Sequence, residues 1–151
     1  MRPEEAEMEP EATFPLKGTW YNELGSTMVI KTIDPTNQTV LGTYQSAVSS
    51  SGCAQGVFPL VGSSDVLSGG QTFGWTVCWL NASSKCWSTT SWAGQLLEDN
   101  ATITALWLLT MKVDPDEEWA STLIGQDVFT RNQPTEDEVV QAIRTKRHPH
   151  P

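Results

Sequence analysis

Four of the seven tryptophans lie among hydroxyl-bearing and small residues, in β-rich runs that are separate in the sequence: Trp79, Trp92, Trp107 and Trp119. Several tryptophans that a closed sheet brings together can form an aromatic box around a small ligand. Filling a core is the commoner use of any single tryptophan. The residues around these four tryptophans are polar and uncharged, as in Ser88-Thr89-Thr90-Ser91-Trp92, and this favours a binding cavity instead.

Alternation along the runs puts polar uncharged residues on the same face as the tryptophans, because successive side chains of a strand point to opposite faces. These shared faces are Trp20 and Asn22; Tyr44, Ser46 and Val48; Trp75, Val77 and Trp79; Cys86, Ser88, Thr90 and Trp92; Leu123, Gly125, Asp127 and Phe129. A plain core would be aliphatic there, and a solvated face would carry Lys and Glu. The mixture predicts an inward face that lines a cavity.

Clusters of Gly, Asn, Asp, Pro and Ser separate eight β-rich runs, and helix signals are almost absent before residue 134. The runs lie near residues 18–22, 27–33, 39–47, 56–62, 72–80, 85–97, 101–111 and 119–131. Their connections are short enough for an up-and-down meander, which avoids open edges by closing into a small barrel with room for one ligand. The predicted fold class is therefore all-β, an eight-stranded antiparallel up-and-down barrel.

A length of 151 residues suits a single domain. We expect a disordered acidic leader at 1–15, where glutamates crowd the first positions, a barrel domain at 16–131, and a short helix or disordered tail at 132–151. In the tail, Thr135-Glu136-Asp137-Glu138 resembles a capping box before an apolar helix face.

The charge and the residue types argue against several function classes. A formal net charge of −9 supplies no phosphate-neutralising patch, so we expect neither nucleic acid nor an anionic membrane surface as partner. The nearest approach to a membrane span, residues 101–111, is too short. Both histidines lie in the tail, and no Ser–His–Asp arrangement, ligand cluster or phosphate loop occurs, so no enzyme, cofactor or metal site is predicted.

Apolar side chains also recur on the outward face of the late runs: Leu106, Leu108, Ile124 and Val128. Scattered surface hydrophobic residues are the simpler alternative, but repetition on neighbouring strands favours a subunit interface. For location we expect secretion, with an intracellular protein as the alternative. No signal peptide is visible, and the sequons at Asn37, Asn81 and Asn100 lean slightly toward a secreted protein.

Six segments, in order and at matching spacing from about Leu16 to Arg131, resemble the avidin family of biotin-binding proteins. They are residues 18–26 (GTWYNELGS), 42–48 (GTYQSAV), 74–79 (GWTVCW), 88–95 (STTSWAGQ), 107–109 (WLL) and 119–127 (WASTLIGQD). The resemblance implies high-affinity, non-covalent biotin binding in a deep pocket at one end of an eight-stranded barrel, usually a tetramer, without catalysis. The alternative is a lipocalin-like carrier of another small hydrophobic ligand, whose cavity should be mostly aliphatic.

The resemblance also assigns roles. Asn22, Ser26 and Tyr44 match three donors to the ureido oxygen of biotin, and Asp127 and Ser46 match acceptors for its two N–H groups. Thr90 matches the hydroxyl beside the ring sulfur. The residues that match the contacts to the tail of biotin are Ser88, Val48, Ser49 and Ser50. The matching walls are Trp79, Trp92, Trp107 and Leu109. Trp119 matches a residue lent to the neighbouring subunit's site, while Trp20 and Trp75 are left to the core.

Three cysteines leave one unpaired if a disulfide forms. We expect Cys53 and Cys86 to pair, which would fasten the loop after the third run to the sixth and imply an oxidising compartment. Cys78 falls on the face opposite Trp79 and is difficult to bridge to Cys86. Free buried thiols are the alternative.

Overall fold

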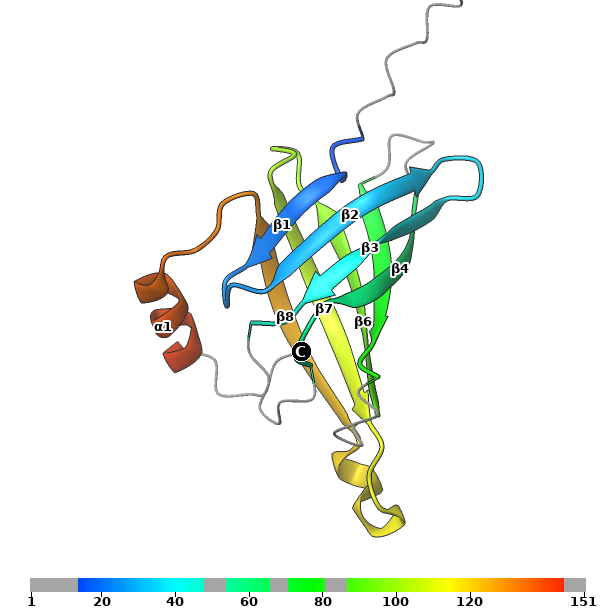
Figure 1. The fold of residues 1–151 in the computed structure, drawn as a ribbon, viewed down its shortest axis with the longest axis vertical. Helices are drawn as coiled ribbons and strands as arrows, with labels where there is room; N and C mark the ends of the chain where they lie inside the picture. Colours follow the sequence, from blue (N-terminus) through cyan, green and yellow to red (C-terminus); the bar gives the residue numbers. More distant parts are fainter. Residues whose placement is uncertain (1–13, 48–53, 66–70, 81–86, 146–151) are drawn as a thin grey trace, which may run out of the picture.

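Eight antiparallel strands close into a barrel in the computed structural model, which describes residues 14–47, 54–65, 71–80 and 87–145 (Figure 1). Each strand pairs with the next along the chain, and the last pairs with the first. The strands are β1 Gly18–Asn22, β2 Thr27–Asp34, β3 Thr39–Gln45, β4 Phe58–Ser64, β5 Thr72–Cys78, β6 Ser88–Leu96, β7 Thr102–Met111 and β8 Thr122–Thr130. The predicted fold class is confirmed; the predicted domain boundaries stay a prediction.

The eighth run was predicted too long at its beginning. Trp119 does not lie on a strand but in a 3-10 helix, η2 (Pro115–Ala120), and β8 starts only at Thr122. Pro115 opens this helix, where a missing N–H costs nothing, and three acidic residues follow it in the first turn. These local signals outweigh the β-propensity of the tryptophan.

The predicted alternation is present along the barrel. On β7, Ile103, Ala105, Trp107 and Leu109 are buried, while Leu106 and Leu108 between them are exposed. On β8, Asp127 and Phe129 are buried, and Ile124 and Gln126 are exposed. The inner faces of all eight strands meet in one cluster of apolar and aromatic side chains, and this cluster is the core.

Arg131 fastens the seam where the barrel closes. The register of β1 with β8 includes only two pairs, Tyr21↔Thr130 and Asn22↔Phe129. Directly after β8, the Arg131 guanidinium lies 3.6 Å from the centre of the Trp20 ring. It donates to the carbonyl oxygens of Thr19 (3.1 Å), Lys17 (3.0 Å) and Pro15. The planar five-donor group thus ties the end of β8 to the chain that enters β1.

Beyond the barrel, helix α1 (Glu136–Thr145) lies beside the β1–β2 turn (Figure 1). The Thr135–Glu138 pattern forms a capping box: the Thr135 hydroxyl accepts from the Glu138 backbone N–H at 3.2 Å, and the Thr135 N–H donates to the Glu138 carboxylate at 3.3 Å. In the part of the chain that the structure describes, no helix is long and apolar enough to cross a membrane.

Several predictions concern residues outside the described ranges. These are the acidic leader up to residue 13, the Cys53–Cys86 disulfide, the site residues Val48, Ser49 and Ser50, the sequon at Asn81, and the last six residues of the tail. Cys78 is described: it is exposed, and its thiol is free.

Arg131→Lys should lower the free energy of unfolding by about 2–4 kcal/mol, because an ammonium group cannot reproduce the stack on Trp20 together with the bonds to carbonyl oxygens. Denaturant unfolding measures this loss. Arg144→Lys, on the exposed face of α1, is the matched control and should stay within about 0.5 kcal/mol of the parent. Equal stability of the two variants would show that Arg131 does not secure the seam.

Candidate functional site

Five polar side chains from five different segments are buried inside the barrel, each no more than 1% exposed: Asn22, Ser26, Tyr44, Thr90 and Asp127. All five were predicted as site residues. Burying polar groups is costly unless hydrogen bonds satisfy them. The arrangement of those bonds decides which atoms remain for a ligand.

The β1–β2 turn orients the amide of Asn22. Its Oδ1 accepts two backbone N–H groups, from Leu24 at 3.0 Å and from Ser26 at 2.9 Å. Gly25 completes the turn with a φ of +86°, which suits glycine. Because the oxygen is engaged by the turn, Nδ2 is the atom directed inward, where it lies 3.5 Å from the Tyr44 hydroxyl. Asn22 therefore presents a donor to the interior.

The hydroxyl of Ser26 joins the turn to β3. Its oxygen accepts the Ala47 backbone N–H at 3.0 Å, and it also hydrogen-bonds to the Tyr44 phenol. Burial raises the pKa of Tyr44 well above its ordinary value, and the negative charge of Asp127 raises it further. Tyr44 thus keeps its proton and remains able to donate.

Two tryptophan N–H groups hold the other polar residues in place. Trp92 Nε1 donates to Oδ2 of Asp127 at 3.0 Å, and Trp79 Nε1 donates to the Thr90 hydroxyl at 2.8 Å. The sequence predicted these tryptophans only as walls. No sequence signal points to the Trp92–Asp127 bond, since the two residues lie 35 positions apart on strands that are not paired.

Aromatic rings surround this polar group. Tyr44 lies 4.9 Å from Trp92 and 5.6 Å from Trp79, between ring centres, and the two indoles meet edge to face at 6.4 Å. Phe58 on β4 packs edge-on against Trp79 at 5.1 Å, a contact that the sequence analysis did not anticipate. The sequence signal for Phe58 was weak, because a buried phenylalanine on a strand is usually an ordinary core residue.

Trp107 is buried and depends on a glycine opposite it. The two residues Trp107 and Gly125 are partners in the β7–β8 ladder. A Cβ added to Gly125 would lie 2.0 Å from a carbon of the Trp107 indole, so only glycine leaves room for the ring. Leu109 is buried two residues along β7.

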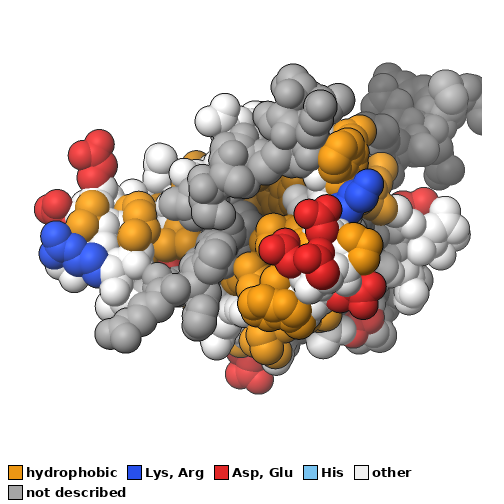
Figure 2. Space-filling model, turned by 90° about the horizontal axis from the view of Figure 1, so that it is seen from below, with side chains coloured by type: hydrophobic (Ala, Val, Ile, Leu, Met, Phe, Trp, Pro, Cys, Tyr) orange, Lys and Arg blue, Asp and Glu red, His pale blue; other side chains and the backbone are white. Residues whose placement is uncertain are grey.

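The remaining predicted residues that the structure describes are less buried than these, apart from the walls described above. Ser46 and Ser88 are partly buried, next to the end of β3 and at the start of β6. Trp119 is 86% exposed on η2 and takes no part in the buried cluster of its own barrel. Figure 2 views the molecule from the end where η2 lies, and hydrophobic side chains gather there beside acidic ones.

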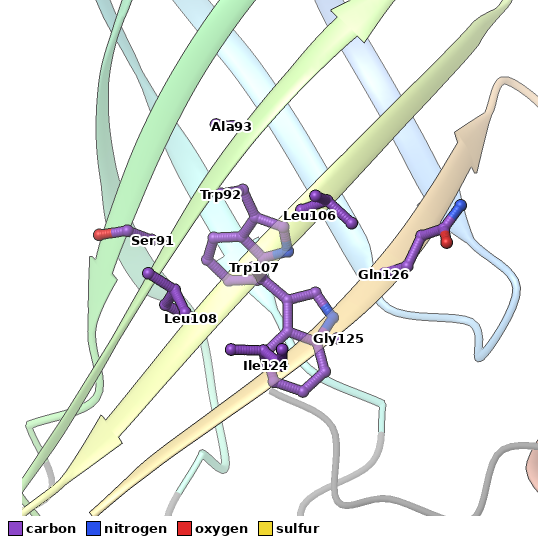
Figure 3. A pocket seen from close by; sticks show the side chains of 9 residues that line it. All are labelled: Ser91, Trp92, Ala93, Leu106, Trp107, Leu108, Ile124, Gly125 and Gln126. Carbon is purple, nitrogen blue, oxygen red and sulfur yellow. The ribbon is translucent and has the colours of Figure 1, made fainter.

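A groove of about 530 Å³ crosses the strands β6, β7 and β8 (Figure 3). Its lining includes the outward side chains Leu106, Leu108 and Ile124, which are 66%, 53% and 71% exposed. Trp107 and Gly125 also line this groove. Three of the predicted outward apolar positions, Leu106, Leu108 and Ile124, are confirmed, while Val128 is only partly buried; their use as a subunit interface stays a prediction.

The comparisons with known proteins agree on one family. The Avidin family model matches residues 10–132. Avidin-related protein 4/5 from Gallus gallus is 35% identical over 120 residues, which make up 77% of each chain, and avidin from the same species is 33% identical over 122 residues, again 77% of each. Afifavidin from Afifella pfennigii is 32% identical over 117 residues, 76% of this chain and 68% of that one.

A solved structure described as a biotin binding protein from chicken shares the fold, with a TM-score of 0.64 and 36% sequence identity. The match covers 78% of this chain and 95% of that one. Together with the closed barrel and the family match over residues 10–132, this establishes that the chain belongs to the avidin family.

Proposed function

We propose that this protein binds biotin non-covalently and with high affinity, in a pocket at one end of the barrel, and that no catalytic step follows. One observation carries the proposal: the hydrogen bonds of the β1–β2 turn leave the Asn22 amide as a donor beside the hydroxyl groups of Tyr44 and Ser26. Family membership and the neighbour described as a biotin binding protein support it.

The ureido group of biotin is complementary to this set. Its carbonyl oxygen can accept several hydrogen bonds, which Asn22, Ser26 and Tyr44 would donate, as in an oxyanion hole. Its two N–H groups need acceptors, for which we propose Asp127 and Ser46. A carboxylate acceptor gives a charge-assisted bond, which is stronger than a neutral one.

For the rest of the ligand, we propose that the hydroxyl of Thr90 lies beside the ring sulfur. The Trp79 indole fixes the position of this hydroxyl. Ser88, Val48, Ser49 and Ser50 would receive the pentanoate tail, and Trp79, Trp92, Trp107 and Leu109 would form the walls. The polar groups are already ordered by one another, so a ligand need not order them. A carrier of purely hydrophobic ligands would need no such set of buried donors and acceptors, whose burial is costly, and this opposes the lipocalin-like alternative.

Biotin should change the tryptophan fluorescence of the protein at micromolar concentration. Asn22→Asp keeps an acceptor for the Leu24 and Ser26 N–H groups but removes the inward donor, and Tyr44→Phe removes only a hydroxyl. Each should weaken biotin binding at least tenfold, since a lost buried bond costs about 1.5 kcal/mol or more. Isothermal calorimetry measures the affinities.

The matched control for Asn22→Asp is Asn132→Ala, an exposed asparagine beyond β8, which should bind biotin as the parent does. Neither a fluorescence change nor calorimetric heat with the parent protein would contradict the proposed function. Unchanged affinity of both site variants would contradict the donor assignment alone.

The raised pKa of Tyr44 predicts a loss of stability at alkaline pH. Above about pH 10 the tyrosine ionises in the unfolded chain but stays protonated in the barrel, so the unfolded state binds fewer protons and stability falls as pH rises. The slope reaches about 1.4 kcal/mol per pH unit. Urea unfolding at pH 8 and above 10 should show this slope for the parent and a smaller one for Tyr44→Phe. Tyr21→Phe, which leaves Tyr44 in place, should retain it.

We also propose that the protein assembles as a homotetramer in which Trp119 reaches a neighbouring subunit's site. The support is the exposed indole on η2 and the apolar groove outside β6 to β8, since large exposed apolar patches mark interaction sites. Trp119 would then link ligand affinity to assembly.

Leu108→Arg should shift the assembly toward smaller species in light scattering coupled to gel filtration, because a charge would be desolvated at the interface. Leu41→Arg, at an exposed leucine of β3, is the control and should leave the molar mass of the assembly unchanged. A monomeric parent protein would overturn the proposed tetramer, and with it the role of Trp119.

For location we propose the outside of the cell. The sequon asparagines Asn37 and Asn100 are exposed and thus accessible to a glycan. The proposed Cys53–Cys86 disulfide would need the same oxidising surroundings.

A further inference from the structure

We propose that Trp75, which the sequence analysis left to the core, is a positioning residue for the ligand site: it holds the Trp92 indole in the orientation in which its N–H binds Asp127. The effect on ligand binding rests on the proposed biotin function, but the contact between Trp75 and Trp92 exists without ligand. The proposal concerns a residue whose side chain makes no hydrogen bond to Asp127, Asn22, Ser26 or Tyr44, since its Nε1 has no partner among the described residues.

Trp75 and Trp92 are joined directly. They are partners in the β5–β6 ladder, and both point inward. Their rings are stacked, with 5.4 Å between centres and an interplanar angle of 7°. Aromatic pairs across neighbouring strands are among the stronger contacts within a sheet. The plane of Trp92 therefore follows the plane of Trp75.

Trp75 is itself held firmly. It is 2% exposed, it stacks on Phe73 with 4.2 Å between centres and an angle of 15°, and Phe129 meets its ring edge-on at 5.7 Å. The contacts come from two strands, β5 and β8. A ring with such neighbours has one orientation, and it can impose that orientation on Trp92.

Trp92 passes this constraint to the site. Its Nε1 lies 3.0 Å from Oδ2 of Asp127, and its ring lies 4.9 Å from Tyr44. A hydrogen bond weakens steeply as the donor turns away from the acceptor. A rotation of the Trp92 ring would thus disturb both the acceptor and one donor of the proposed ureido site.

The choice of tryptophan at position 75 is itself informative. Trp75 Nε1 is buried and has no hydrogen-bond partner among the residues that the structure describes. An unpaired buried donor is destabilising, and phenylalanine at the same position would avoid it. This cost opposes a tryptophan at position 75, and only the packing of its larger ring can offset it. What the indole adds is a larger flat surface against Trp92.

Two variants and one control test this. Trp75→Leu removes the stack, and Trp75→Phe keeps a smaller one. Ile30→Ala is the control: this side chain of β2 is buried, and its ladder partners are Gly18 on β1 and Gly42 on β3. For each protein we would measure the exchange of the Trp92 indole N–H by ¹⁵N NMR without ligand, the dissociation rate of biotin, and the stability to urea. Trp92→Phe assigns the indole signal.

Trp75→Leu should speed both the exchange of the Trp92 N–H and the dissociation of biotin by about tenfold or more. Trp75→Phe should give intermediate values for both rates. Ile30→Ala should lose stability but leave both rates near those of the parent. This split separates a positioning role from a purely structural one.

Parent-like exchange and dissociation rates in both Trp75 variants would overturn the proposal, as would an equal acceleration in Ile30→Ala. If Trp75→Leu does not fold, Trp75→Phe decides alone, since it must still accelerate both rates. If the parent protein does not bind biotin, the proposed function fails, and the exchange of the Trp92 N–H still decides whether Trp75 orients this indole.

Discussion

The site depends on the pairing of β8 with β1. Asn22 is the last residue of β1 and lies opposite Phe129, two positions beyond Asp127 on β8. The seam that closes the barrel therefore brings the donor amide and the carboxylate to the same end, although 105 positions separate them in the sequence. A further hydrogen bond strengthens this seam, since the Glu23 carboxylate accepts the backbone N–H of Val128 at 3.1 Å. Arg131 holds the same seam nearer the start of β1, so the contacts that close the barrel also keep the two site residues at one end.

A closed barrel with polar groups inside must satisfy those groups before any ligand arrives, because their burial is otherwise costly. Here aromatic residues satisfy some of these polar groups. Trp79 and Trp92 use their N–H groups to hold Thr90 and Asp127, while their rings exclude water around Tyr44. One side chain thus supplies apolar surface and hydrogen-bond order at once, which phenylalanine could not do. The result is a site organised by its own contacts, the condition under which binding costs least.

Much of the fold and of the site was predictable from the sequence, because side chains alternate between the two faces of a strand. Alternation correctly placed Asn22, Thr90 and Asp127 inside and Leu106 and Leu108 outside. The capping box before α1 was readable because it is local, spanning only Thr135 to Glu138. Trp119 was placed on a strand because its own propensity was weighed without Pro115, which starts a helix four residues earlier. The indole bonds and the packing of Phe58 could not be read, since they arise only when distant strands close into a ring.

Strand β7 shows why site and surface cannot vary independently. Trp107 faces the interior, and its immediate neighbours Leu106 and Leu108 face the outer groove. The ring of Trp107 fits only because β8 carries glycine at position 125, and the residue before that glycine, Ile124, is again in the groove. A shift of one residue in the β7–β8 register would reverse both faces at once. Any partner seated on the groove would therefore restrain the register that places Trp107, so the proposed assembly would act on the site through the sheet as well as through the proposed contact of Trp119.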